Sequence, residues 1–298
     1  MAFNRPDLLR VLLDRLRQIA PTRVFVSVDG ARTGREGEAA LVQECRDLVA
    51  TIDWPCEVSS LFQDRNLGCG LGVSTAISWF FEHVERGIIL EDDIIPDPSF
   101  FPFCTELLDR YQDDHRVFAI AGCNFAPRAA LEHPEQAYRF SQVPHIWGWA
   151  TWRRSWQQHQ LDISGWRRRL PIRTLWSRLG HSIPATVYWT GIFELLARKQ
   201  VDTWDGQFVL ASMASQQLTA TSNVNLIENI GFGETATHTV EDRHELTAGS
   251  IQLPTAAVPV VVDRKADEWT RVHHFNATWR GMVDQLDGYR KQRQRRKA

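Results

Sequence analysis

The sequence predicts an α/β protein in which a mostly parallel sheet is flanked by helices. Between residues 7 and 120, short apolar segments rich in β-branched residues alternate with longer segments whose apolar residues recur at helical spacing. Such an alternation is typical of strand–helix–strand units joined by right-handed crossovers. The chain has 298 residues, of which 43% are hydrophobic, so it can form one large domain or two small ones around a substantial core.

The first 122 residues contain the regular part of this pattern. Pro6 fits the first turn of a helix, and Asp29-Gly30 is a turn signal that ends the first strand. We expect strands, bounded by such signals, at residues 23–28, 56–62, 87–90 and 117–120. We expect helices at residues 7–20, 36–52, 72–84 and 100–111.

The pattern changes after Gly122, where a tryptophan-rich segment begins. Eight of the twelve tryptophans fall in this segment, namely Trp147, Trp149, Trp152, Trp156, Trp166, Trp176, Trp189 and Trp204. No Gly/Ser/Pro-rich linker precedes it, so we expect it to pack on the sheet as the second half of one domain. The remaining expected elements are helices at 184–199 and 205–216 and a strand at 218–227.

These patterns divide the chain into one large domain and a shorter carboxyl-terminal part. The domain spans residues 1–240 and has two halves, residues 1–122 and 123–240. Residues 241–298 lose their periodicity, and we expect an irregular wrap that ends in a helix and a basic tail. No internal repeat is present.

Charge and composition narrow the possible partners and compartments. The net charge of −2 gives no global attraction to nucleic acid or lipid. The last nine residues carry six basic side chains, which indicate a solubilising end or a weak peripheral contact with an anionic membrane. No apolar run approaches the roughly 18 residues of a membrane span, and no secretion signal opens the chain. Five cysteines without a C-x-x-C pair fit free thiols, so we expect a cytoplasmic protein.

Three adjacent carboxylates follow the apolar strand at residues 87–90. Glu91, Asp92 and Asp93 stand at its carboxyl end, the edge at which open α/β sheets bind ligands. Three such charges repel one another, so a divalent cation is their natural partner. In an extended backbone, Glu91 and Asp93 would share one face and Asp92 would face the other way. The alternative is a solvated strand end that leads into Pro96 and Pro98.

Polar residues follow three other predicted strand ends, and parallel strands would bring all four ends to one rim. Asp29 could accept hydrogen bonds from a base or a ribose, and Arg65 could neutralise a phosphate. Equally, Asp29 could be a turn former and Arg65 a surface residue. Only three residues precede Asn4-Arg5, which leaves open a short first strand or a start downstream of the true one. The four ends are Asn4-Arg5-Pro6, Asp29-Gly30, Arg65-Asn66-Leu67-Gly68 and Glu91-Asp92-Asp93.

These motifs together resemble the GT-A glycosyltransferases, and most of all the N-acetylglucosaminyltransferase I type and its bacterial relatives. The resemblance covers most of residues 3–240 and implies a Rossmann-like GT-A fold. Besides the four strand ends, it rests on His145-Ile146-Trp147-Gly148-Trp149, Asp202-Thr203-Trp204-Asp205, Gly231-Phe232-Gly233 and Thr237-His238. By this resemblance, Trp147, Gly148 and Trp149 lie near the donor sugar, and Asn4, Arg5, Asn66 and Gly68 contribute to the nucleotide-sugar site.

The resemblance also implies a metal and a catalytic base. Asp93 would bind Mn²⁺ or Mg²⁺, Asp92 would contact the ribose, Glu91 would support both, and His238 would reach the metal or the diphosphate. Asp205 would be the base that deprotonates the acceptor hydroxyl, with Asp202 as the second choice, and single displacement would invert the anomeric centre. Gly206 and Gln207 depart from the doubled aspartate of the eukaryotic enzymes.

The implied activity is metal-dependent transfer from a nucleotide-diphosphate sugar, such as a UDP-sugar, to a glycan, its lipid-linked precursor or a protein. Two alternatives remain. A sugar-1-phosphate nucleotidyltransferase needs a glycine-rich basic loop after the first strand, and Asn4-Arg5-Pro6 does not supply it. A non-catalytic carbohydrate-binding protein would explain the tryptophans but not the acidic cluster. An aspartyl-phosphate phosphatase is excluded, because Glu91 stands where its nucleophilic aspartate would be.

Overall fold

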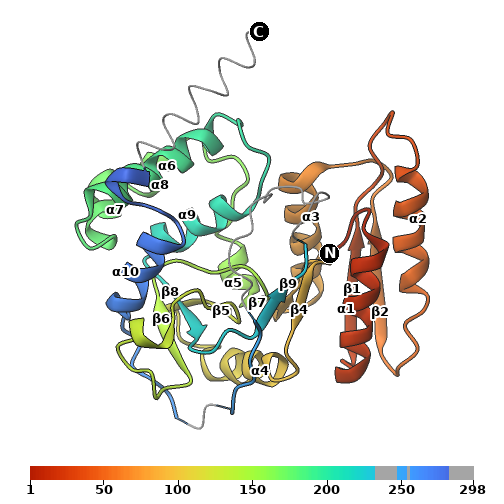
Figure 1. Ribbon diagram of the computed structural model, residues 1–298. Helices are drawn as coiled ribbons and strands as arrows, with labels where there is room; N and C mark the ends of the chain where they lie inside the picture. The colour runs from red at the N-terminus through yellow and green to blue at the C-terminus, as the bar shows by residue number, and fades with distance from the viewer. Residues whose placement is uncertain (232–246, 254–255, 282–298) are drawn as a thin grey trace.

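The computed structural model describes residues 1–231, 247–253 and 256–281, and it shows a mixed α/β protein (Figure 1). The described helices are α1 (Pro6–Ile19), α2 (Glu38–Val49), α3 (Gly68–His83), α4 (Phe100–Arg110), η1 (Arg128–Ala130), α5 (Arg153–Trp156), α6 (Trp166–Arg169), α7 (Ile172–Arg178), α8 (Ile183–Ala197), α9 (Asp205–Ser215) and α10 (Arg264–His273). The described strands are β1 (Arg23–Val28), β2 (Glu57–Phe62), β3 (Arg86–Ile89), β4 (Ile94–Pro96), β5 (Val117–Ala121), β6 (Tyr138–Ser141), β7 (Trp149–Trp152), β8 (Leu218–Ser222) and β9 (Ile227–Asn229).

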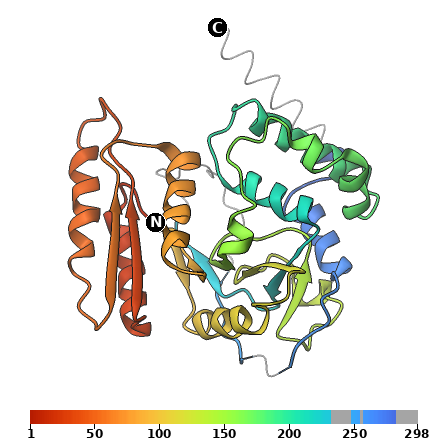
Figure 2. The ribbon, with the colours of Figure 1, turned by 180° about the vertical axis from the view of Figure 1, so that it is seen from behind.

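The first 62 residues form a unit with its own core at one end of the molecule. Strands β1 and β2 pair in parallel from Arg23 with Glu57 to Val28 with Phe62. Leu and Val side chains of α1 and α2 pack with those of β1, and Trp54 closes the cluster. Helix α3 stands between this unit and the rest of the chain in both views (Figures 1 and 2). The predicted strand–helix pattern of this part is confirmed.

The first two residues link this unit to the large sheet. Ala2 forms a parallel bridge with Val28, donating its amide to Ser27 O at 2.9 Å and accepting from Asp29 N at 3.1 Å. On the other side, the amino group of Met1 donates to Leu90 O at 2.9 Å, just beyond β3. Two residues therefore take the place of a strand between β1 and β3.

The large sheet has five strands in the order β3-β7-β5-β8-β6, and it is mixed. Only the β5–β8 pair is parallel among its described pairings, so the prediction of a mostly parallel sheet is not confirmed. The reason is the tryptophan-rich segment, whose residues Trp149–Trp152 insert as β7 between β3 and β5, antiparallel to both. This segment was expected to pack on the sheet, and part of it instead lies within the sheet.

Most predicted elements of the second half are confirmed, but the strand expected at 218–227 is broken into β8 and β9. Ser222 Oγ accepts from Val224 N at 3.2 Å and donates to Val224 O at 2.6 Å, which turns the chain out of the sheet. The chain then returns as β9, which pairs antiparallel with β4. Helix α3 also begins four residues earlier than predicted, at Gly68.

Helix α10 packs back onto the large sheet. Asp263 caps it by accepting from Ala266 N at 2.8 Å, and Asp263 N donates to Phe140 O of β6 at 2.9 Å. Within the described part of the chain, no helix has the length and apolarity needed to cross a bilayer.

We predict that Gly148→Ala destabilises the protein by about 2 to 4 kcal/mol, because two costs add. Gly148 has φ +62°, which L-residues adopt with strain, and a Cβ there would collide with the side chain of Ile227. Urea unfolding measures the change. Gly191→Ala is the control, since a Cβ there meets open space inside helix α8 and should stabilise by about 0.5 to 1 kcal/mol. Equal effects of the two substitutions would contradict the packing described here.

Candidate functional site

The three predicted acids form a turn between β3 and β4. Ile94 N donates to Glu91 O at 3.1 Å, so the backbone reverses instead of running extended. Asp92 is buried, whereas Glu91 and Asp93 are half-buried. The expectation that Glu91 and Asp93 share one face therefore does not hold, because the turn directs Asp92 and Asp93 toward one common partner.

That partner is Arg5, at the start of α1. Its Nη1 donates to Asp93 Oδ2 at 3.0 Å, and its Nη2 and Nε donate to the two oxygens of Asp92. Burial raises the pKa of Asp92 even though the guanidinium opposes it, and the two carboxylates raise the pKa of Arg5 against the effect of its own burial. One cation thus balances two of the three acids, and the pair ties α1 to the acidic turn.

Within the described part of the chain, Glu91 has no cation in direct contact, and only the charge of the Met1 amino group opposes the rise of its pKa. Its carboxylate has no hydrogen bond or ion pair among the described residues, while burial, and then the charges of Asp93 and Asp92, raise its pKa to about 8. At neutral pH this side chain therefore holds a proton in the folded protein. A cation beside it would favour the ionised form.

Asp29 lies at the end of β1, as predicted, and the protein itself uses its carboxylate. It accepts from Asn66 Nδ2 at 3.0 Å, from Leu67 N at 3.0 Å and from Gly68 N at 3.2 Å. The amide of Gly30 donates to it as well, at 2.8 Å. Four donors fill most of the acceptor positions of a carboxylate, so Asp29 holds the loop that begins α3.

Asp202 holds the same helix from the other side. Its Oδ2 accepts from Cys69 N and its Oδ1 from Gly70 N, both at 3.0 Å. These amides belong to the first turn of α3, where no backbone acceptor is available and the helix dipole favours a negative charge. Asp202, the second choice for the base, is therefore a cap in this structure. The earlier start of α3 follows from these two carboxylates.

Asp205 lies three residues further, in the first turn of α9. Its Oδ1 accepts from Thr203 Oγ1 at 2.5 Å and from Gly206 N at 2.7 Å. Its Oδ2 has no hydrogen-bond partner among the described residues, and the residue is half-buried. One oxygen is fixed while the other is available, which is the arrangement that a general base needs.

Tryptophan stacking fixes the segment that carries Asp205. Trp204 stacks on Trp149 of β7 with ring centroids 5.5 Å apart and an interplanar angle of 19°. Trp149 is 1% exposed and also packs on Phe208, so its ring belongs to the core and cannot stack on a sugar from solvent. The predicted donor-site role of Trp149 thus becomes one of positioning Asp205 through Trp204.

The charges of these segments meet at Cys69. Burial, and then the charges of Glu91, Asp205 and Asp202, raise the pKa of its thiol to about 12. Asp205 also raises the pKa of Glu91. The acidic turn, the start of α3 and the 202–205 segment therefore form one negatively charged site, and the last of these lies more than 100 residues from the other two.

The remaining predicted residues lie around this site in different roles. Trp147 is half-buried against Phe125, with ring centroids 5.5 Å apart. Asn4 donates to Glu38 at 3.1 Å, which holds the loop after β1. The Arg65 side chain is exposed and makes no hydrogen bond or ion pair with the described residues, so it is available to a ligand.

Gly231 lies against Asp93 of the acidic turn, and the sequence alone does not indicate this contact. Ile230 N donates to Asp93 O at 2.9 Å, and a Cβ on Gly231 would collide with the Asp93 carboxylate. Only glycine fits this approach. His238, the predicted second metal ligand, lies outside the described residues.

No group of three or more His, Cys, Asp or Glu side chains in the described part of the chain is arranged to hold a metal ion. At the acidic turn, Arg5 engages Asp92 on both oxygens and Asp93 on one. The oxygens left without a described partner are those of Glu91 and Oδ1 of Asp93. These are hard donors, and Mg²⁺ typically takes one or two carboxylates together with substrate phosphates.

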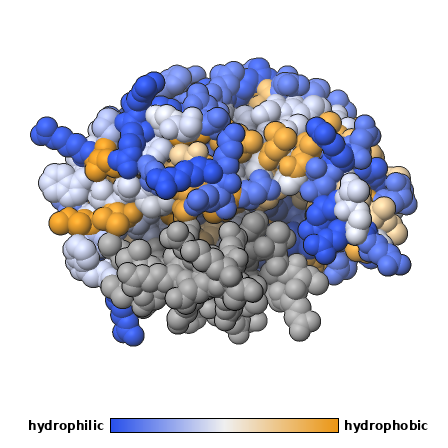
Figure 3. All heavy atoms as spheres, turned by 90° about the horizontal axis from the view of Figure 1, so that it is seen from above, coloured by the Kyte–Doolittle hydropathy of each residue, from blue (hydrophilic) through white to orange (hydrophobic). Residues whose placement is uncertain are grey.

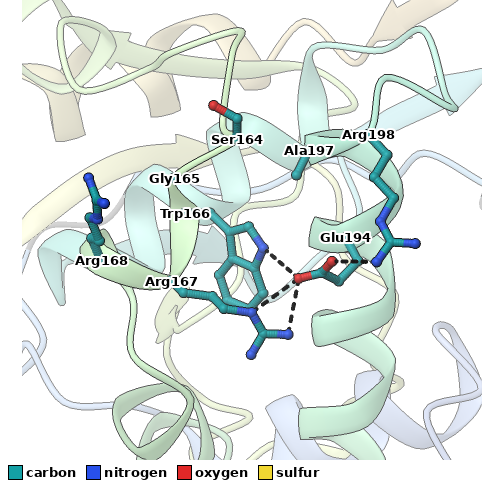
Figure 4. A pocket seen from close by; sticks show the side chains of 8 residues that line it. All are labelled: Ser164, Gly165, Trp166, Arg167, Arg168, Glu194, Ala197 and Arg198. Carbon is teal, nitrogen blue, oxygen red and sulfur yellow. Dashed lines mark hydrogen bonds and ion pairs between the residues drawn. The ribbon is translucent and has the colours of Figure 1, made fainter.

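A cavity of about 550 Å³ lies away from this site (Figure 4). Trp166, Arg167, Glu194 and Arg198 are among its lining residues. Its lining contains none of the site residues discussed above, so we base the functional assignment on the acidic site.

Comparison of the chain with protein-family models and with curated proteins found no match.

We predict that Glu91 makes the protein less stable as the pH rises from 5 to 8. The folded protein keeps a proton on Glu91 up to about pH 8, whereas an unfolded chain releases it near the ordinary value of 4.5, so folding loses free energy across this window. Glu91→Gln removes this loss. The difference in free energy of unfolding between Glu91→Gln and wild type should therefore shift in favour of the variant by about 2 to 4 kcal/mol between pH 5 and pH 8.

Urea unfolding at both pH values measures this change. The matched control is Glu82→Gln on the exposed side of α3, which should follow the wild-type profile. Parallel curves for wild type and Glu91→Gln would contradict the raised pKa of Glu91.

Proposed function

We propose that this protein is a metal-dependent glycosyltransferase that moves a sugar from a nucleotide diphosphate, such as UDP, to a hydroxyl of a glycan or related acceptor. The proposal includes a GT-A type of fold around the site. One observation carries it: the Glu91–Asp93 turn, the start of α3 and Asp205 act electrostatically on one another. A departing diphosphate needs a cation site, and an acceptor hydroxyl needs a base; the acidic turn and Asp205 support these two roles.

Charge and donor chemistry support a divalent cation at the acidic turn. Asp93 Oδ1 and the Glu91 carboxylate would hold it, and Arg5 would remain on Asp92. When bound, Mn²⁺ or Mg²⁺ supplies a Lewis acid that neutralises charge on the diphosphate. Two protein oxygens fit a cation that takes its further ligands from the substrate.

Asp205 is the base in this proposal. Its free Oδ2 takes the proton of the acceptor hydroxyl as the oxygen attacks the anomeric carbon, and the bond from that carbon to the diphosphate breaks. Thr203 and the Gly206 amide hold the other oxygen, which limits rotation of the carboxylate. Because no covalent intermediate forms, the product has the inverted configuration.

The start of α3 argues against a sugar-1-phosphate nucleotidyltransferase. Such an enzyme binds phosphate on free amides of a glycine-rich loop. Here the amides of Leu67, Gly68, Cys69 and Gly70 already donate to Asp29 or Asp202. The exposed Arg65 is the group left to neutralise a phosphate at this rim.

We predict that a UDP-sugar raises the melting temperature of the protein only together with Mn²⁺ or Mg²⁺, and that Asp93→Ala removes this stabilisation. A ligand that binds the folded state must raise the melting point, and Asp93 supplies an uncommitted oxygen to the cation. Thermal shift over a panel of nucleotide sugars, with calorimetry on the best ligand, measures the effect. Asp113→Ala, an exposed acid elsewhere, is the control. An unchanged affinity of Asp93→Ala for the UDP-sugar with its cation would contradict a cation site at Asp93.

We predict that Asp205→Asn keeps donor binding but slows transfer by about 100-fold or more, because the amide cannot accept the proton. UDP release with a panel of simple glycoside acceptors measures transfer, and calorimetry measures binding. The control is Asp113→Asn at an exposed position, which should leave binding and transfer unchanged. Asp202→Asn, which keeps one of its two bonds to the α3 amides, is compared with both. Loss of transfer in Asp202→Asn with full activity in Asp205→Asn would exchange the two roles, and retention of configuration would exclude the single displacement.

A further inference from the structure

Residues 160–199 differ from the rest of the chain in charge. This segment, which we term the basic lobe, contains helices α6, α7 and α8 and carries seven basic side chains and two acids. Its formal charge of +5 contrasts with the net charge of −2 for the whole chain, so the remainder carries −7. The lobe lies at the end of the molecule opposite α1 and α2 (Figures 1 and 2).

The surface of the basic lobe is also unusually apolar. Helix α8 has one charged residue in 15, so it is hydrophobic on all sides, as is typical of a helix covered all round. Among the described residues, one side of α8 is covered, by residues such as Leu175, Leu210 and Met213. On the other side, Ile183 is 55% exposed and Val187 is 45% exposed.

The exposed apolar residues gather at the turn between α7 and α8. Trp176, 39% exposed, meets the His181 ring edge to face at 4.4 Å, and His181 N donates to Trp176 O at 2.9 Å. Ile183 follows two residues later and opens α8. Viewed from above, orange hydrophobic residues reach the surface among blue hydrophilic ones at this end of the molecule (Figure 3).

Two arginines of the basic lobe have no partner among the described residues. Arg168 and Arg173 are exposed, and neither makes an ion pair or a side-chain hydrogen bond with the described residues. Arg167 and Arg198 instead converge on Glu194 from opposite sides, while Arg168 points away (Figure 4). Two guanidiniums and the Trp166 indole, at 3.2 Å, all donate to this single carboxylate, so it offsets little of the positive charge of the lobe.

We infer that the basic lobe binds the surface of an anionic membrane, with Trp176, Ile183 and Val187 entering the headgroup region. Arginines attract anionic headgroups, and aliphatic and indole side chains gain free energy by leaving water for the acyl boundary. Nucleic acid would match the arginines but would leave Ile183 and Val187 in water. A second copy of the lobe would bring like charges together.

The lobe contacts the helix that carries the proposed base, at the end of α8 that lies away from the apolar tip. Helix α8 ends at Ala197, and a Cβ on Gly206 in α9 would collide with Leu196 of α8. The lobe therefore packs directly on the helix that carries Asp205. Membrane binding is independent of the sugar chemistry and is tested without it.

The test is sedimentation of the full-length protein with vesicles of phosphatidylcholine alone or with 30% phosphatidylglycerol. We expect binding to the anionic vesicles only, weakened at least tenfold by Arg168→Glu/Arg173→Glu and by Trp176→Ser/Ile183→Ser. The controls are Arg35→Glu/Arg128→Glu, which makes the same charge change, and Val11→Ser/Leu41→Ser, which also removes two exposed apolar side chains; both lie outside the lobe and should bind as wild type does.

Three other results would overturn the inference. If the lobe variants and wild type bind the anionic vesicles equally, the lobe is not the membrane-binding surface. Loss of binding only when Arg293, Arg295, Arg296 and Lys297 are replaced by glutamine would assign the contact to the basic tail. A wild-type dimer that Trp176→Ser/Ile183→Ser converts to a monomer in sedimentation velocity, or binding of RNA in place of vesicles, would assign the lobe to a different partner. UDP-sugar binding stays intact in all these variants, so failure here is distinct from failure of the transferase proposal.

Discussion

The site depends on two carboxylates that hold the first turn of α3. Asp29 comes from the end of β1 and Asp202 from the loop before α9, and between them they accept from the four successive amides of residues 67–70. Amides in a first helical turn have no partner in their own helix, so each bond satisfies a donor that would otherwise need water. The clamp therefore joins the amino-terminal unit to the segment of Asp205. Because of this connection, the carboxylates of Asp202 and Asp205 act electrostatically together with those of the acidic turn.

The sequence is informative wherever structure is set by local pattern. The β-branched run before Glu91 and the helical spacing in residues 7–20 are periodic signals, and both elements form where they were expected. The mixed sheet could not be predicted in the same way. Strand β7 contains Trp149 and Trp152 with only two small residues between them, and its place between β3 and β5 is set by contacts distant in sequence. Parallel pairing was inferred from the first half, where crossovers dominate, and the second half does not follow it.

The site shows the same division between local and distant information. Clustered acids at a strand end mark a ligand position from sequence alone, and the choice of Glu91–Asp93 rested on this. Sequence does not show which acid has a partner, because the pairing of Arg5 with Asp92 and Asp93 spans more than 85 residues. It also cannot separate Asp202 from Asp205, since three residues of spacing fit a helix cap and a base equally well. Trp149 was expected near the donor sugar because it follows Gly148 in a motif that resembles the glycine loop of GT-A enzymes. In the structure its ring is buried in the core.

The narrow seam formed by Met1 and Ala2 has a consequence for cooperativity. The amino-terminal unit has its own apolar core. It meets the rest of the chain through backbone bonds at this seam, the ion pairs of Arg5, and apolar contacts of Leu16 and Ile19 with the core of the large sheet. A unit with its own core opens as a separate unit, at a free energy below that of global unfolding. A diphosphate and its cation at the acidic turn would span this seam. Ligand binding would then couple two subglobal folding units into one.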